Sequence, residues 1–196
     1  MKTAIIVLII IGFVIVRIIY SQIQSKPQDN SPNPDWLRGY ETFIENLRLS
    51  GSRRVFSNGG KDYAIILLKE LIIEGERQEI FIYERKFPSK LFMDYKVYKA
   101  LRNALALKTT VKILYNEETE YMQDFKQIMN DYPNILYRQT ELLPDGHESA
   151  TGIQLIGDRT YRYEFNGETH QSYFSFNQPD VNHTWKQRLL EMWKKS

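Results

Sequence analysis

The sequence predicts an α/β domain, a mixed sheet flanked by helices, behind an N-terminal transmembrane helix. Three observations carry this prediction. Strand-like and helix-like segments alternate between residues 79 and 138, then three strand-like segments follow one another, and an uncharged apolar run lies near the N-terminus. Alternation with short links indicates parallel strands joined by right-handed crossovers, whereas strands linked by Gly-Asp or Asn-Gly turns indicate antiparallel hairpins.

The apolar run from Thr3 to Tyr20 predicts a membrane anchor over residues 1–20, with residues 3–20 in the membrane. A helix needs about 20 residues to cross the hydrocarbon layer, and Arg17 can extend its charged end to the lipid surface. A cleaved signal peptide also fits a short basic start, but no A-x-A-like cleavage site follows. A buried helix of a soluble domain is the third alternative. We expect a single-pass anchor with a cytoplasmic C-terminal domain, although basic residues flank the run on both sides.

Residues 21–33 are polar, contain proline and lack an apolar period, which predicts a flexible linker to a domain at 34–196. Asn33-Pro34 supplies a helix start and Gly51 a stop, so a helix is expected between them. A short strand at 53–56 and a helix from Lys61 to about Gly75 should follow.

The middle of the domain should form three parallel strands and two helices. Strands are expected at 79–84, 109–115 and 134–138, where β-forming residues cluster. Ser89 should cap the first helix, and the acidic start at Glu117 suits the N-terminus of the second. Later apolar residues, around 153–155, 161–165 and 173–176, predict hairpin strands, and the apolar stripe after Pro179 predicts a terminal helix.

Composition excludes several classes of function. Outside the first twenty residues, 24 basic side chains balance 24 acidic ones, so a nucleic-acid partner is not expected, although a local basic patch stays open. Cysteine is absent, which excludes thiolate chemistry and disulfides. The three histidines have no metal-site spacing, so we expect neither a metal nor another cofactor.

From Lys61 to Trp193 the chain resembles one half of the phospholipase D superfamily. The likeness rests on the strand IFIYERKF, the helix DYKVYKALRNALAL leading into TTVKILYNEE, and the ending YRYEFNGETHQSYFSFNQPDVNHTWKQRLLEMW. In this comparison Thr151, Ile153 and Asp158 stand where the family carries the His, Lys and Asp of H-x-K-x(4)-D.

The resemblance implies the loss of the family's chemistry. Active members use one His to attack phosphorus, a second to protonate the leaving oxygen, and Lys to stabilise the phosphoryl oxygens. A threonine without a base and an isoleucine cannot do this, and no His-x-Lys occurs anywhere in the chain. Because two such units pack together in the family, the resemblance also implies a homo-oligomer or a protein partner.

Three residues of the predicted hairpin have two interpretations each. Asp158 follows Gly157 where a turn selects Asp and Gly on conformational grounds, so it is either a turn residue or the remnant of a site. Arg162 and Glu164 share one face of a strand, which favours a cross-strand ion pair or a solvated face over ligand contacts.

Arg85, Lys86 and Lys90 form the strongest local basic cluster. It follows a predicted strand, at the sheet edge where open parallel sheets bind ligands. A solvated loop and an anion contact both fit this pattern.

The leading hypothesis is therefore a membrane-anchored, non-catalytic phospholipase D-like domain that acts through protein interaction or self-association. One alternative is a phosphodiesterase or nuclease with a non-standard site, built from His147 or His170 and the Arg85–Lys90 cluster. Another is a membrane effector in bacterial defence or envelope stress.

Overall fold

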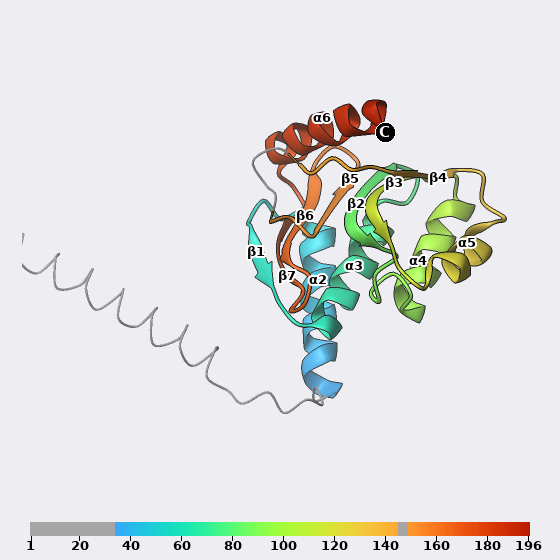
Figure 1. The fold of residues 1–196 in the computed structure, drawn as a ribbon. Coiled ribbons are helices and arrows are strands. Elements are labelled where there is room, and N and C mark those ends of the chain that lie inside the picture. The colour runs from blue at the N-terminus through green and yellow to red at the C-terminus, as the bar shows by residue number, and fades with distance from the viewer. Residues whose placement is uncertain (1–33, 145–148) are drawn as a thin grey trace, which may run out of the picture. The chain divides into compact units, whose positions relative to one another are not determined.

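A seven-stranded mixed sheet forms the centre of the described structure, a computed structural model that covers residues 34–144 and 149–196 (Figure 1). The strand order across the sheet is β1-β7-β6-β5-β2-β3-β4. The strands are β1 (Phe56–Asn58), β2 (Glu79–Phe87), β3 (Thr110–Glu118), β4 (Ile135–Gln139), β5 (Gly152–Ile156), β6 (Thr160–Asn166) and β7 (Gln171–Ser175).

Both predicted kinds of strand pairing are confirmed, and they meet at the β2–β5 pair. Strands β2, β3 and β4 are parallel, whereas β5 is antiparallel to β2. The β5–β6 and β6–β7 pairs are antiparallel hairpins, and β1 pairs antiparallel with β7. It follows that β2 and β6 run in the same direction, so the ends of both strands and the start of β5 lie at one edge of the sheet.

Helices cover the two faces of the sheet unequally. Side chains from α2 (Pro34–Ser50), α3 (Lys61–Glu74), α4 (Tyr95–Ala106) and α5 (Met122–Met129) pack with one face in the larger hydrophobic core. The helix α6 (Pro179–Lys195) packs on the other face in a second, smaller core, and Figure 1 shows it apart from the other four helices.

Two predicted helix starts were wrong. Helix α4 begins at Tyr95, where the Asp94 side chain accepts a hydrogen bond from the Lys96 backbone N–H at 2.9 Å, so Asp94 and not Ser89 is the N-cap. Phe92, predicted within that helix, lies in the preceding turn and is fully buried. Helix α5 begins at Met122 and not at Glu117, because β3 continues alongside the end of β2 as far as Glu118.

The predicted anchor at 1–20 and linker at 21–33 lie outside the described residues. Within 34–144 and 149–196, no helix has the length and apolar character that crossing a membrane requires.

Candidate functional site

A row of side chains at the carboxyl end of β2 and β6 is polar although it lies inside the protein. Glu84 on β2 is directly opposite Gly152 on β5, Gly152 is opposite Glu164 on β6, and Glu164 is opposite Ser172 on β7. All four are buried. Buried polar groups need hydrogen-bond partners, so this row must carry its own network.

The network is completed by the next row, which pairs Gln154 with Arg162. Gln154 Nε2 donates to Glu84 Oε1 at 2.6 Å, and Arg162 Nη1 donates to Gln154 Oε1 at 2.8 Å. The same Arg162 nitrogen lies 3.1 Å from Glu164 Oε2, and Arg162 Nε donates to Ser172 Oγ at 3.2 Å. A continuous chain of polar contacts therefore crosses four strands, β2, β5, β6 and β7, and includes Arg162, which is 0% exposed.

Gly152 provides the space for this network. A Cβ at this position would lie 2.7 Å from Glu84 Oε1 and 3.1 Å from Gln154 Nε2, closer than side-chain atoms normally approach. Glycine is required here by the packing of its neighbours, since its φ is not in the left-handed region.

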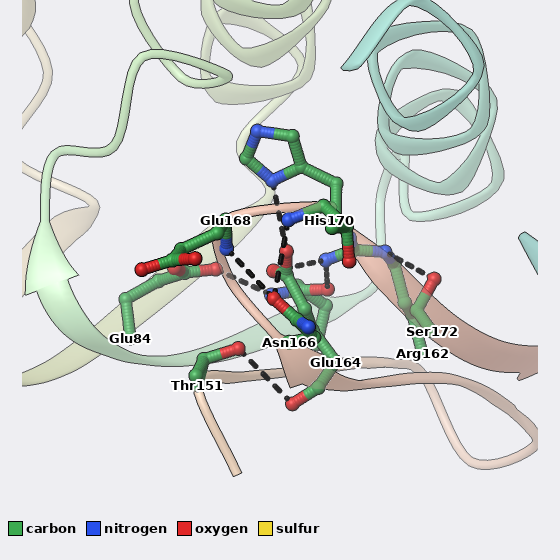
Figure 2. Close-up of polar contacts among 10 residues, drawn as sticks. Glu84, Thr151, Arg162, Glu164, Asn166, Glu168, His170 and Ser172 are labelled. Carbon is green, nitrogen blue, oxygen red and sulfur yellow. Dashed lines mark hydrogen bonds and ion pairs between the residues drawn. The ribbon is translucent and has the colours of Figure 1, made fainter. Parts of the chain in front are cut away.

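The turn between β6 and β7 brings a histidine to the end of the network. The Asn166 side chain accepts from the backbone N–H of Glu168 (3.0 Å) and of Thr169 (3.1 Å), which shapes the turn. His170 then adopts a positive φ of 55°, and its Nδ1 lies 2.9 Å from Glu164 Oε1 (Figure 2). Because a carboxylate accepts hydrogen bonds, Nδ1 donates and Nε2 is left for other partners.

The network lies against a pocket of about 480 Å³. One side of the pocket comes from the end of β2 and the loop after it, and the other from Thr151, Glu164 and the turn before β7. The lining residues are Glu84, Arg85, Lys86, Ser89, Lys90, Thr151, Glu164, Gly167, Glu168 and His170, and we refer to them as the Glu84–His170 pocket. No group of His, Asp and Glu side chains in the described residues is arranged to hold a metal ion.

The two buried glutamates differ in their electrostatics. Burial raises the pKa of the Glu84 carboxyl well above its ordinary value, and the nearby Glu164 raises it further. Burial also raises the pKa of Glu164, but the Arg162 guanidinium and the His170 ring together bring it below the ordinary value. Glu164 is therefore the ionised partner of the two.

The three positions of the catalytic motif do not converge. Thr151 is half-buried at the pocket and donates from Oγ1 to the Glu164 backbone carbonyl at 3.3 Å. Ile153 is fully buried in the smaller core beneath α6, on the other face of the sheet. Asp158 lies in the β5–β6 turn at the opposite end of β5, with a side chain 95% exposed. That these residues are the remnant of a motif stays a prediction.

Other residues singled out from the sequence do come together. Arg85, Lys86 and Lys90 all line the Glu84–His170 pocket. Arg162 and Glu164 share one face, as the alternation predicted. Their ion pair lies along β6 and not across strands, and a solvated face was wrong because both are buried. His147 lies outside the described residues.

Sequence reasoning missed Glu84 and Gln154 entirely. Both lie in strands that read as apolar, and nothing local distinguishes a buried glutamate from an exposed one. The available signal was the alternation of side chains along β5 and β6. Once the strand register is known, it places Gln154 and Arg162 on the same face of the sheet.

No profile of a known protein family matches the sequence, and no curated protein matches it either. Several solved structures match the fold. The archaeal chromatin protein TrmBL2, described as showing a novel mode of DNA binding, is 14% identical with a TM-score of 0.54, and the match covers 81% of this chain. Polyphosphate kinase from Porphyromonas gingivalis is 17% identical with a TM-score of 0.52, over 82% of this chain.

The chain spans about 60% of the length of the TrmBL2 chain and 31% of the kinase chain. The phospholipase D family member Nuc from Salmonella typhimurium is 16% identical over 72% of this chain and 95% of its own, but with a TM-score of 0.49. The matched kinase has a phospholipase D-superfamily fold, so the predicted phospholipase D-like fold is confirmed as a fold. Identities this low carry no function with them.

Proposed function

We propose that this phospholipase D-like domain binds a phosphate-bearing ligand in the Glu84–His170 pocket and acts through binding and protein association, without the hydrolytic chemistry of the family. The single observation that carries the proposal is the convergence of Arg85, Lys86, Lys90 and the His170 ring on one pocket. These groups come from β2, the loop after it and the β6–β7 turn, far apart in the sequence.

The charges around the pocket favour an anion. The Glu164 carboxylate is paired with the Arg162 guanidinium at 3.1 Å and accepts a hydrogen bond from His170 Nδ1 at 2.9 Å. Lys86 and Lys90 are exposed at the rim, where their amino groups can turn toward a ligand. Of the two, Lys86 has an ion pair at 3.6 Å with Glu117, whose side chain is itself largely exposed, so the contact is easily exchanged.

The family's own chemistry is not supported by the residues at its motif positions. Ile153 cannot stabilise a phosphoryl anion and points away from the pocket, and Asp158 is at the far end of its strand. Thr151 does reach the pocket, but its hydroxyl donates to the Glu164 backbone carbonyl.

Titration of the full-length protein with inorganic phosphate and with dimethyl phosphate, followed by phosphorus NMR, tests the proposal. We expect both to bind, and the double substitution K86A/K90A to weaken binding by about tenfold or more, the usual effect of removing hydrogen bonds to a charged group. The matched control K194A/K195A removes two exposed lysines at the end of α6 and should leave binding unchanged. Equal weakening by both pairs would indicate general electrostatic attraction and contradict a built site.

A second candidate is a phosphodiesterase with a non-standard site. The Glu164–His170 contact favours it, because a carboxylate that fixes Nδ1–H leaves Nε2 as a nucleophile or general base. Hydrolysis of bis(p-nitrophenyl) phosphate or DNA should then disappear in H170A and persist in H183A, since His183 is exposed on α6. Folded protein without activity on several substrates removes this candidate.

We further propose that residues 3–20 anchor the domain in a membrane and that the domain self-associates. The apolar run supports the first part and the paired units of the resembled family support the second. The full-length protein should stay with membranes after alkaline carbonate extraction, whereas a variant beginning at residue 21 should be released. Crosslinking in membranes that yields only monomers would contradict self-association.

A further inference from the structure

Glu84 and Glu164 lie on either side of Gly152 but have very different partners. Glu164 is in contact with Arg162 and with His170. Within residues 34–144 and 149–196, Glu84 has a single hydrogen bond, from the neutral Gln154 amide, and no ion pair. Glu84 is only 4% exposed, so water provides little compensation for a charge there.

An ionised Glu84 would therefore be a buried charge beside a second buried carboxylate. Such an arrangement is costly, and a buried carboxyl without a cationic partner takes up a proton instead. The direction of the Glu84 pKa, raised first by burial and then by Glu164, agrees with this argument.

The network also fixes which oxygen carries the proton. Arg162 can only donate, so the atom of Gln154 that faces it is Oε1, and the Gln154 NH₂ group must face Glu84. Glu84 Oε1 accepts from that NH₂ group at 2.6 Å. The proton of a neutral Glu84 therefore belongs on Oε2, which has no hydrogen bond within the described part of the chain.

We propose that Glu84 enters the Glu84–His170 pocket as a neutral carboxylic acid and donates a hydrogen bond from Oε2 to an oxygen of the bound phosphate. The inference rests on the proposed function, since it assigns a residue to the ligand of that pocket. Glu84 lines the pocket beside the basic residues of the same strand, so one anion can contact both. A hydrogen bond from an uncharged acid adds a donor without adding further positive charge.

The assignment has a consequence for pH. As the pH rises above the ordinary value of 4.5 and through the raised pKa, Glu84 loses its donor and gains a charge that repels the ligand. Other groups around the pocket and beside Glu84 also carry or can change charge. They are Arg162, Glu164, Glu168 and His170 from β6 and its turn, Arg85, Lys86 and Lys90 from β2 and its loop, and Tyr115 from β3. All of them are retained when only Glu84 is changed.

Glu84→Gln is the informative variant, because its amide keeps both the acceptor for Gln154 and a donor for the ligand. The full-length wild-type protein and E84Q are titrated with dimethyl phosphate, which stays a single anion, from pH 4.5 upward, with phosphorus NMR as the readout. With rising pH, wild-type affinity should fall by about tenfold or more beyond any fall seen for E84Q, which retains the other titratable groups around the pocket. E84A, which has no donor, should bind weakly throughout.

Infrared difference spectra of the ligand-free wild type and E84Q test the protonation separately. The wild type should show the carbonyl stretch of a buried neutral carboxyl, sensitive to deuteration, and E84Q should lack it. If the wild type binds but its pH profile runs parallel to that of E84Q, the inference is overturned. It is also overturned if the carbonyl band is unchanged in E84Q. If neither protein binds dimethyl phosphate or inorganic phosphate at any pH, the proposed function itself fails and this inference with it.

Discussion

Arg162 Nη1 lies 3.1 Å from Glu164 Oε2, and solvent reaches almost none of either side chain. The arginine also contacts Gln154 and Ser172, so it joins strands β5, β6 and β7 through their side chains. Buried charges are stabilised by their hydrogen-bond and ion-pair partners, so removing one partner leaves the other charge uncompensated.

Replacing Arg162 by Met should lower the free energy of unfolding by about 3–5 kcal/mol, the usual cost of breaking a buried ion pair, because Glu164 then lacks its main counter-charge. Urea unfolding followed by circular dichroism measures the change. The double variant R162M/E164Q should be more stable than R162M, since it removes the orphaned charge as well. If R162M is as stable as the wild type, the buried pair does not contribute as argued.

Gly152→Ala should lower the free energy of unfolding by about 1–3 kcal/mol, because the added methyl group collides with Glu84 Oε1 and Gln154 Nε2. Gly39→Ala is the matched control: nothing lies within 4 Å of its added Cβ, and the residue is in the interior of α2. This control should gain about 0.5–1 kcal/mol from helix propensity. Adding Glu84→Ala to G152A should recover part of the loss, and the absence of any recovery would place the strain elsewhere.

Stability should depend on Glu84 in a defined direction of pH. Because its folded-state pKa is raised, the folded protein holds a proton above pH 4.5 that the unfolded chain releases. The contribution of Glu84 is therefore fully present below the unfolded-state pKa and is lost as the pH rises through the folded-state pKa. Urea midpoints from pH 4.5 upward should fall for the wild type and fall less for E84Q.

Glu164 should act in the opposite direction, because its pKa is lowered in the folded state by Arg162 and His170 despite burial. Its contribution is present above the unfolded-state value of 4.5 and is lost as the pH falls through the lower folded-state pKa. Acid unfolding should thus begin at a higher pH in H170A than in the wild type. The exposed His183, replaced in the same way, serves as the control.

The predictable part of this protein is the part with a local pattern. Alternating strands and helices, hairpin turns and the apolar stripe of α6 follow from periodicity, and the structure has each of them. Helix starts were less predictable, because Ser89 and Asp94 are both competent caps and only the structure shows that Asp94 is the one used.

The candidate site could be predicted only in fragments. The Arg85–Lys90 cluster and the shared face of Arg162 and Glu164 are visible in the sequence, but their meeting at one edge depends on the β2–β5 pairing, which no local pattern specifies. The contact of His170 with Glu164 depends further on the positive φ of His170 itself. Both are tertiary properties.

The H-x-K motif should not be restorable by substituting Thr151 and Ile153. Ile153→Lys buries an ammonium group among the hydrophobic side chains of the smaller core beneath α6 and should cost about 4 kcal/mol or more. Thr151→His introduces its ring at the half-buried edge of the pocket and should cost about 1 kcal/mol, the worth of the lost hydrogen bond. Thermal unfolding of the two single variants measures the difference. A stable I153K protein would contradict this prediction, because it would show that the smaller core accommodates the ammonium group.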